Sequence, residues 1–264
     1  MNNIKLVVSD LDGTLLGTDS QLTQRTIDTV NKLFESGIHF AIASGRSRSS
    51  VSKIIDQLNL PMYAICNNGA NVYDKDWNSL HVAPIESHIV EKVVKFLNNK
   101  NISYNGFDEN NVYARSKDVA SAISLERCFF RVISLDEIDS FPQMMKLLAK
   151  DEAHIISKIK DEILKEDFAK DLDITVSHPL CLDIVGKNAT KGLGIKLLAD
   201  ALNITCSEIM AFGDADNDLH MLETAGYPIV MENGLPHLKE KFFNIAPPNF
   251  DDGVAIYLEK YFNL

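Results

Sequence analysis

The chain has 264 residues, of which 45% are hydrophobic, and its formal net charge is −11 at pH 7. This length is near the size at which a single hydrophobic core stops growing, so one or two domains are expected. The acidic balance argues against nucleic acid or an anionic membrane as a partner, and no apolar run approaches membrane-spanning length. The N-terminus has no signal-peptide pattern, and the four cysteines are scattered without metal or redox spacing, so a cytoplasmic protein is predicted.

The chain opens with a short apolar run, Ile4 to Val8, typical of a strand that is buried on both faces. The sequence DLDGT (10–14) follows it directly. Because side chains alternate along an extended chain, Asp10 and Asp12 leave the strand on the same side. Two carboxylates this close resist burial unless a cation or a proton lies between them. The pair predicts a divalent-metal site, and a solvated turn is the alternative.

Strands and helices alternate in the next fifty residues. Thr23 can cap a helix, and a second apolar strand over 38–43 ends in the polar turn SGR (44–46). A second helix is predicted from about Arg48 to a point before Pro61, and a third strand over 62–66 ends in NNG (67–69). This alternation builds a right-handed parallel sheet with helices on both faces. The predicted fold class is therefore α/β with a Rossmann-like parallel-sheet core.

The pattern changes near Asp74, where residues 74–80 are polar turn material. Up to about Gly186 the predicted elements are strands at 102–109, 111–117 and 154–160, helices at 87–99, 142–150 and 161–171, and a hairpin at 174–186. Such a mixture predicts an inserted α+β domain. The expected boundaries are 1–83 for the first part of the core, 84–186 for the insert and 187–264 for the second part of the core.

The first pattern resumes after Thr190. The elements predicted here are a helix over 191–202, a strand over 208–212, a helix that carries Leu219 and Leu222, short strands at 227–231 and 244–246, and a closing helix over 254–261. The strand over 208–212 ends in GDADND (213–218), so four predicted strands of the core end in polar turns, and Lys191 opens the intervening helix. Any one of these turns alone is more often structural. All four at equivalent positions predict one site at the carboxyl ends of the strands.

These motifs resemble those of the haloacid dehalogenase (HAD) superfamily, specifically the Cof-type phosphatases with a type IIB α/β cap. DLDGTLL (10–16) is similar to the first motif of that superfamily, ASGR (43–46) to the second, Lys191-Gly192 to the third and GDADND (213–218) to the fourth. The resemblance covers the whole chain. It implies the HAD fold, in which the insert is a mobile cap that closes over the site and selects the leaving group.

The residues of the first motif allow the phosphatase chemistry that the resemblance implies. Asp10 is predicted to attack phosphorus and form an aspartyl-phosphate, which divides hydrolysis into two steps. Asp12 is predicted to protonate the departing oxygen and then to take a proton from the attacking water. Dehalogenases and ATPases of the superfamily lack a carboxylate at the second position, so Asp12 favours phosphatase or phosphomutase chemistry.

Mg²⁺ is the predicted cofactor, because it prefers carboxylate, carbonyl and water oxygens. Its predicted ligands are Asp10, Asp12 through the backbone carbonyl, Asp214 and Asp218. The predicted phosphate-binding residues are Leu11, Ser44, Gly45, Lys191 and Asn217. The candidate substrate contacts are Arg46, Asn68 and Gly69. Asp216 is expected to cap the following helix, and Asp183 is a candidate partner that orients Lys191.

The predicted function is Mg²⁺-dependent hydrolysis of a small phosphorylated metabolite. The resemblance implies a sugar phosphate, with pyridoxal phosphate and flavin mononucleotide as other substrates to consider. A phosphomutase is disfavoured. Capped mutases of the superfamily usually carry a small helical cap between the first two motifs, and here residues 15–38 leave room for only one predicted helix. A non-catalytic phosphometabolite sensor would be free to lose Asp10, Asp12 or Lys191, and all three are present here. A phospho-accepting receiver module would be much shorter than this chain. The expected partner is a small phosphate ester, with no nucleic acid and no membrane, and the chain is expected to be a monomer or homodimer.

Overall fold

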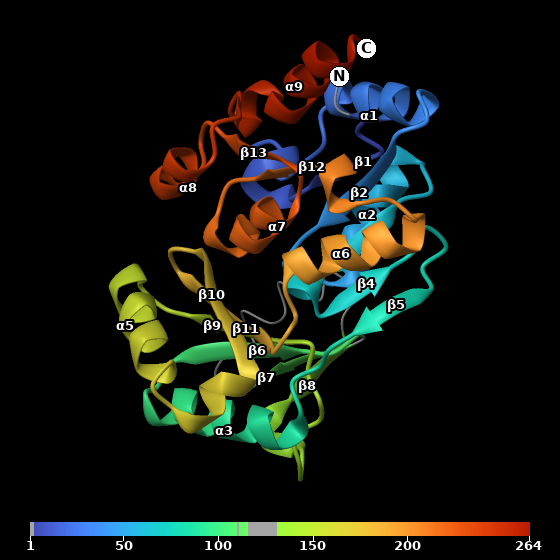
Figure 1. Ribbon diagram of the computed structural model, residues 1–264. Helices are drawn as coiled ribbons and strands as arrows, with labels where there is room; N and C mark the ends of the chain where they lie inside the picture. Colours follow the sequence, from blue (N-terminus) through green and yellow to red (C-terminus); the bar gives the residue numbers. More distant parts are fainter. Residues whose placement is uncertain (1–2, 110, 116–130) are drawn as a thin grey trace. The chain divides into compact units, whose positions relative to one another are not determined.

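The computed structural model describes residues 3–109, 111–115 and 131–264. The chain divides into two compact units, shown in Figure 1. The core unit comprises Met1–His81 and Thr190–Leu264, and the insert unit comprises Val82–Ala189. The insert predicted over 84–186 lies within this second unit.

An eight-stranded sheet forms the centre of the core unit, in the order β14-β13-β12-β1-β2-β3-β4-β5. The strands are β1 (Leu6–Ser9), β2 (His39–Ala43), β3 (Tyr63–Cys66), β4 (Asn71–Tyr73), β5 (Ser79–Val82), β12 (Ile209–Gly213), β13 (Tyr227–Met231) and β14 (Ile245–Ala246). The pairs from β14 to β3 are parallel, and β4 runs antiparallel to β3. The predicted α/β fold class is confirmed.

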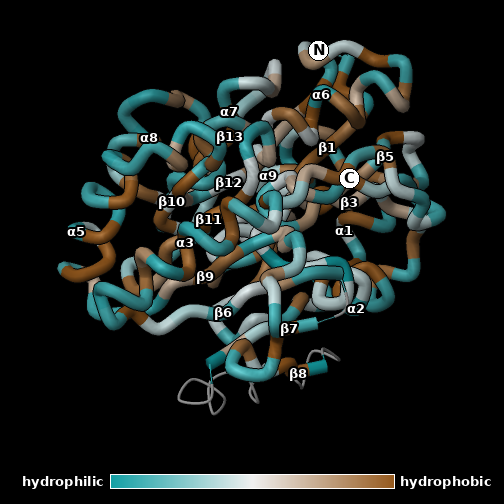
Figure 2. Tube along the Cα trace, turned by 90° about the horizontal axis from the view of Figure 1, so that it is seen from below, coloured by the Kyte–Doolittle hydropathy of each residue, from teal (hydrophilic) through white to brown (hydrophobic). Residues whose placement is uncertain are grey.

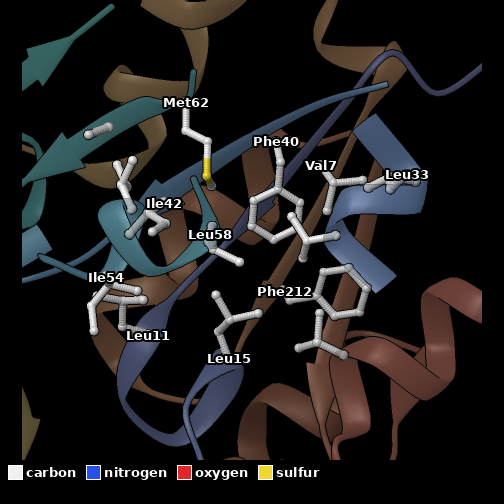
Figure 3. Close-up of a cluster of buried hydrophobic side chains, with 14 of the residues drawn as sticks. Val7, Leu11, Leu15, Leu33, Phe40, Ile42, Ile54, Leu58, Met62 and Phe212 are labelled. Atoms are coloured by element: carbon white, nitrogen blue, oxygen red, sulfur yellow. The ribbon is translucent and has the colours of Figure 1, made fainter. Parts of the chain in front are cut away.

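Helices cover both faces of this sheet. They are α1 (Gln24–Glu35), α2 (Arg48–Leu58), α6 (Lys191–Leu202), α7 (Leu219–Thr224), α8 (Pro236–Lys241) and α9 (Gly253–Phe262). Because side chains alternate along β1, Val7 packs in the cluster of α1, α2 and α9, while Leu6 and Val8 pack in the cluster of α6, α7 and α8. Figure 3 shows Val7 beside Leu33 and Phe212. Burial of both faces explains why the strand is continuously apolar.

The predicted starts of two helices are formed locally. Thr23 precedes α1, and its side-chain oxygen accepts a hydrogen bond from the backbone amide of Thr26 at 3.2 Å, which confirms it as the cap. Thr190 precedes α6 in the same way, and its hydroxyl oxygen accepts from the amide of Leu193 at 3.1 Å. The second cap fixes the position of Lys191, the first residue of α6.

A six-stranded sheet in the order β10-β11-β9-β6-β7-β8 forms the insert unit. Its elements are α3 (Ser87–Asn99), β6 (Ser103–Phe107), β7 (Asn111–Ala114), β8 (Arg131–Ser134), β9 (Lys146–Lys150), α5 (Ala153–Ile163), β10 (Leu172–His178) and β11 (Cys181–Gly186). Both helices pack in one cluster with the same face of the sheet, through residues such as Leu147 and Leu182. The neighbouring strands are antiparallel, except that β7 and β8 are parallel. The predicted α+β character of the insert is present in this unit.

Two predictions in the insert are wrong. Residues 142–150 are not a helix, since β9 occupies Lys146–Lys150 and pairs with both β6 and β11. The sequence KLLAK favours a helix by intrinsic preference, and pairing on both sides overrides that preference. Residues 154–160 are not a strand, because they lie in α5. Ile156, Ile159 and Ile163 are buried there at helical spacing, and hydrophobic and hydrophilic segments alternate along α5 in Figure 2.

Further differences lie at element boundaries and in short elements. The helix predicted over 161–171 is the last turn of α5 and a separate 3₁₀ helix, Asp167–Asp171. The turn predicted over 74–80 ends at β5, and β8 and α8 were not predicted. The strand predicted over 111–117 is β7, and residues 116 and 117 lie outside the described residues. In the described part of the chain, no helix has the length and apolar composition needed to cross a membrane.

Candidate active site

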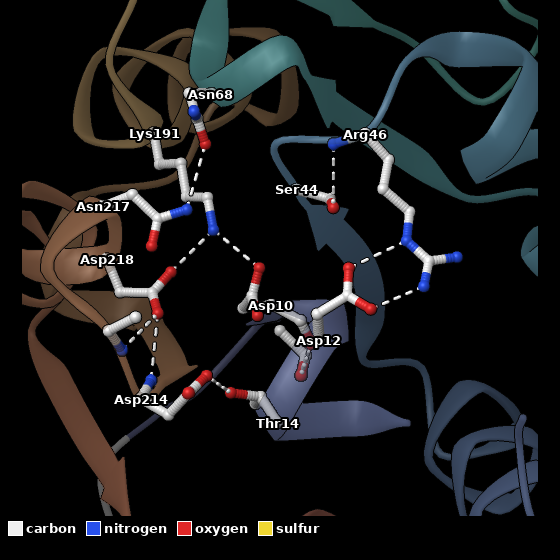
Figure 4. Close-up of polar contacts among 12 residues, drawn as sticks. Asp10, Asp12, Thr14, Ser44, Arg46, Asn68, Lys191, Asp214, Asn217 and Asp218 are labelled. Carbon is white, nitrogen blue, oxygen red and sulfur yellow. Dashed lines mark hydrogen bonds and ion pairs between the residues drawn. The ribbon is translucent and has the colours of Figure 1, made fainter. Parts of the chain in front are cut away.

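Polar side chains meet at the carboxyl ends of the parallel strands of the core unit. Asp10 follows β1, Ser44 follows β2, Asn68 follows β3 and Asp214 follows β12. Figure 4 shows them around Asp10, with Lys191 beside it. The four polar turns predicted from the sequence are thus brought together in space, at the edge where open α/β sheets bind ligands.

The loop that follows β1 is a tight turn closed by backbone hydrogen bonds. The amide of Leu15 donates to the carbonyl of Asp10 at 3.2 Å, and the amide of Leu16 donates to that of Leu11 at 2.9 Å. Gly13 has φ +85°, and a Cβ atom there would lie 2.4 Å from Oδ2 of Asp214. Both the backbone angle and this close approach require glycine. The turn places Asp10 against the loop that carries Asp214.

Lys191 neutralises part of the charge at the centre of the site. Its Nζ donates to Oδ1 of Asp10 and to Oδ1 of Asp218, each at 2.6 Å. The side chains of Lys191 and Asp218 are fully buried, and that of Asp10 is 7% exposed. A buried charge requires a partner of this kind, and charge-assisted bonds of this length are strong. Lys191 is therefore a buried residue of the site and not a solvated surface lysine.

Burial shifts the pKa values of the ionisable groups at this site. It raises the pKa of Asp10 well above its ordinary value, although the Lys191 ammonium opposes the rise. It likewise raises the pKa of Asp214 to about 7, and the nearby carboxylate of Asp218 adds to this effect. Burial alone would lower the pKa of Lys191, but Asp10 and Asp218 outweigh it and raise that pKa. Burial therefore disfavours the ionised form of both carboxyls, in a cluster where three carboxyl groups lie around one lysine.

Asp214 and Asp218 are held by hydrogen bonds from their own loop and from the first motif. The hydroxyl of Thr14 donates to Oδ1 of Asp214 at 2.7 Å. Oδ2 of Asp218 accepts from the backbone amides of Asp214 and Ala215, at 2.9 and 3.0 Å. Asp218 is therefore the acid that caps this turn, and the prediction of that role for Asp216 is wrong. Asp216 pairs with Nε2 of His237 at 2.8 Å instead.

Arg46 and Asp12 form a two-pronged ion pair. Nε of Arg46 donates to Oδ2 of Asp12 at 2.8 Å, and an Nη atom donates to Oδ1 at 2.5 Å. The Asp12 side chain is 54% exposed, unlike that of Asp10. The backbone amide of Arg46 donates to the hydroxyl of Ser44 at 3.1 Å, and Ser44 itself is buried. Arg46, a candidate substrate contact, is paired with an acid in this structure.

Asn68 and Asn217 connect the third strand end with the acidic loop. Nδ2 of Asn217 donates to Oδ1 of Asn68 at 3.1 Å. Asn68 is 4% exposed, and its Nδ2 is buried without a hydrogen-bond partner among the described residues. A Cβ atom on Gly45 would lie 3.0 Å from Oδ1 of Asn68, so the two are neighbours. Close packing requires glycine at position 69, because a Cβ atom there would lie 2.3 Å from the carbonyl oxygen of Thr190.

Known proteins resemble this chain over nearly its full length. A family model described as haloacid dehalogenase-like hydrolase matches residues 7–258. The chain belongs to this family. An HMP-PP phosphatase of Yersinia pseudotuberculosis is 28% identical over 97% of this chain and 95% of its own length. The predicted enzyme class, a phosphatase of the HAD superfamily, is confirmed.

Solved structures share the fold of this chain. SMU.1108c from Streptococcus mutans UA159 has a TM-score of 0.90 and 23% sequence identity, over 99% of this chain and 100% of that one. BT4131, a HAD subclass IIB sugar phosphatase, has a TM-score of 0.84 and 21% identity, over 98% and 99% of the two chains. At these identities the likeness concerns the fold, and it confirms the predicted HAD architecture.

The acidic side chains of this HAD site suit a hard divalent cation. Carboxylate oxygens of Asp10, Asp214 and Asp218 all lie within 4.8 Å of one another. Among the described residues, Oδ2 of Asp10 and Oδ2 of Asp214 have no recorded donor, whereas both oxygens of Asp218 accept hydrogen bonds. Three clustered carboxylates form an oxygen donor set that fits Mg²⁺.

Two results here go beyond the sequence analysis. Thr14 had no predicted role, although its place directly after the acidic turn of a HAD first motif was the available signal. Asp183 was a candidate partner of Lys191, but it lies 3.3 Å from Nζ of Lys146 in the insert unit. Within the core unit, Lys191 is oriented by Asp10 and Asp218.

Proposed function

We propose that this HAD phosphatase hydrolyses small phosphorylated metabolites, sugar phosphates first among them, with Mg²⁺ and through an aspartyl-phosphate on Asp10. The observation that carries the proposal is the buried carboxylate of Asp10, held 2.6 Å from Lys191 within a cluster of acids. A nucleophilic carboxylate attacks phosphorus and divides the reaction into two steps. The alcohol leaves in the first step, and water releases phosphate from Asp10 in the second.

Mg²⁺ would be held by Asp10, the backbone carbonyl of Asp12 and Asp214, with Asp218 contributing through water because protein donors occupy both of its oxygens. When bound, it supplies positive charge that neutralises the carboxylates and the phosphoryl oxygens. This charge is what the site lacks, since burial raises the pKa values of both Asp10 and Asp214. Ionisation of Asp10 is required for nucleophilic attack.

Asp12 is the proposed acid and base for the two steps. Its carboxyl protonates the leaving oxygen in the first step and accepts a proton from water in the second. Its half-exposed position suits exchange of that proton with solvent. Arg46 holds the Asp12 side chain in place by two hydrogen bonds, and an anionic substrate group would compete for the same guanidinium.

The phosphoryl oxygens would be bound by Lys191, the hydroxyl of Ser44, and the backbone amides of Leu11 and Gly45. Removal of one such donor typically lowers the rate by about 10²–10³. The unpartnered Nδ2 of Asn68 supports a further contact with the substrate, because a buried amide without a partner is costly. Asn217 would orient Asn68 through its hydrogen bond to Oδ1.

A phosphate-release assay tests this function. Sugar phosphates, nucleotides and cofactor phosphates are assayed with and without Mg²⁺, using the wild type, Asp10→Asn and Asp216→Asn. Asp216→Asn is the matched control, since it also removes a carboxylate but from a residue paired with His237. We expect Mg²⁺-dependent turnover, with sugar phosphates preferred, that Asp10→Asn abolishes and Asp216→Asn retains. Binding of phosphorylated ligands without any turnover would favour the sensor instead.

A further inference from the structure

The connection between β13 and α8 contacts both loops that carry the acids of the site. Nδ2 of Asn233 donates to the carbonyl oxygen of Gly13 at 2.8 Å. Two residues later, the backbone amide of Leu235 donates to the carbonyl oxygen of Asp214 at 2.9 Å. One short segment, residues 232–235, therefore binds the loop after β1 and the loop after β12. No role was predicted for it from the sequence.

The amide of Asn233 is fixed in its orientation. Its Oδ1 accepts a hydrogen bond from the backbone amide of Asn249 at 2.9 Å, so its Nδ2 faces Gly13. The side chain of Asn249 in turn donates to the carbonyl oxygen of Leu16 at 2.8 Å. Two asparagines thus tie the loop after β1 to the segment after β13 at both ends, through Gly13 and Leu16.

The orientation of the Gly13 carbonyl is coupled to the position of Asp214. Gly13 has a positive φ and lies directly against the carboxylate of Asp214. Its carbonyl belongs to the same peptide group as the amide nitrogen of Thr14, whose hydroxyl holds Oδ1 of Asp214 at 2.7 Å. When Asn233 fixes the plane of this peptide, it also fixes the direction from which Thr14 reaches Asp214.

We propose that Asn233 is a positioning residue for the divalent cation, and that it acts by holding the loops of Asp10 and Asp214 at a fixed separation. The proposal rests on the Mg²⁺ site of the proposed function. Asn233 is exposed and forms no recorded bond to either carboxylate, so its action passes through Gly13 and Thr14. Outer residues that orient ligands commonly tune metal affinity.

Direct calorimetric titration with Mg²⁺ tests the proposal without reliance on turnover. The variants are Asn233→Ala and Asn244→Ala. Asn244 is the matched control, because its Nδ2 also donates to a backbone carbonyl, that of Pro228 at 3.1 Å, between β13 and β14 and away from the acids. Loss of one positioning hydrogen bond predicts a Kd for Mg²⁺ about fivefold higher in Asn233→Ala. Asn244→Ala is expected to keep the wild-type Kd.

The possible results separate this inference from the proposed function. Wild-type protein that binds no Mg²⁺ overturns the proposed metal site and the inference with it. Wild-type binding with an unchanged Kd in Asn233→Ala overturns the inference alone. Equal weakening in Asn233→Ala and Asn244→Ala also overturns it, because the effect would then be general loss of stability.

Two further measurements guard against a variant that folds poorly. Thermal unfolding is followed with and without Mg²⁺, and the upward shift of Tm on addition of Mg²⁺ should be smaller in Asn233→Ala than in Asn244→Ala. Asn249→Ala keeps the backbone amide that donates to Asn233 and removes only the bond to Leu16. Its Kd for Mg²⁺ should therefore rise less, by about twofold. A larger rise in Asn249→Ala than in Asn233→Ala would contradict the proposed route through Gly13.

Discussion

The two units each bury a lysine beside an aspartate, and the two pairs differ in geometry and charge. In the core unit, Nζ of Lys191 lies 2.6 Å from a carboxylate oxygen of Asp10 and of Asp218. In the insert unit, Nζ of Lys146 lies 3.3 Å from Oδ1 of Asp183 and 5.2 Å from the centre of the Phe107 ring. Lys191 opens a helix at the carboxyl edge of a parallel sheet, whereas Lys146 lies in a central strand of the six-stranded sheet of the insert.

Surplus charge distinguishes the two pairs. Asp10 belongs to a cluster of three carboxylates, and among the described residues no such cluster includes Asp183. Burial raises the pKa of Asp10 well above its ordinary value even with Lys191 in contact. A pair within a cluster that retains unneutralised negative charge is poised to accept a cation, whereas a lone lysine–aspartate pair is adequate as a structural contact within a sheet. The comparison predicts that only the core pair affects turnover directly.

Replacing Lys191 should have the largest effect. Lys191→Met removes the ammonium that neutralises Asp10 and binds phosphate, so kcat should fall by about 10²–10³. The measurement is Mg²⁺-dependent phosphate release at saturating substrate, compared with Lys196→Met, which changes a lysine on the same helix α6. Near-wild-type turnover in Lys191→Met would remove the distinction between the two pairs.

Replacing Lys146 should affect stability more than turnover. Lys146→Met leaves Asp183 buried without its ion pair and should lower the free energy of unfolding by about 3 kcal/mol. The double variant Lys146→Met/Asp183→Leu replaces both charges with apolar groups and should recover most of that loss. Urea unfolding of the single and double variants measures both values. A double variant as unstable as the single one would mean that the pair is more than a balanced structural contact.

Replacing Glu208, which forms an ion pair with Lys5 at the surface, should have the smallest effect. Hydrogen bonds from Lys5 and from the amide of Thr205 lower the pKa of Glu208 from 4.5 to about 2. Because the pKa is lower in the folded state, the stabilisation is present above pH 4.5 and is lost as the pH falls through about 2. As the pH falls across this range, the Tm measured by thermal unfolding should decrease slightly less for Glu208→Gln than for the wild type. Parallel curves would show that the pair contributes nothing measurable.

The residues of the core pair could be predicted from sequence, although their contact with each other was not, and the insert pair could not be predicted, for a physical reason. A strand buried on both faces has continuous apolar residues, so the polar residues after it mark the sheet edge, and this located Asp10. In the insert, the sequences of β9 and α5 fit either kind of element, and pairing with neighbouring strands decided between them. Asn233 left no local signal, because the carbonyl that it binds is 220 residues away.

Chemical trapping of the covalent intermediate tests the central claim most directly. Asp12→Asn is mixed with p-nitrophenyl phosphate and Mg²⁺, because loss of the proposed base should slow release of phosphate from Asp10 and let the phosphoenzyme accumulate. Borohydride then reduces an aspartyl-phosphate to homoserine, and mass spectrometry of the digested protein locates it. The account predicts homoserine at position 10, dependent on substrate and absent when Asp10→Asn is added to the variant. Turnover without any modification of Asp10, or with homoserine at another aspartate, would contradict it.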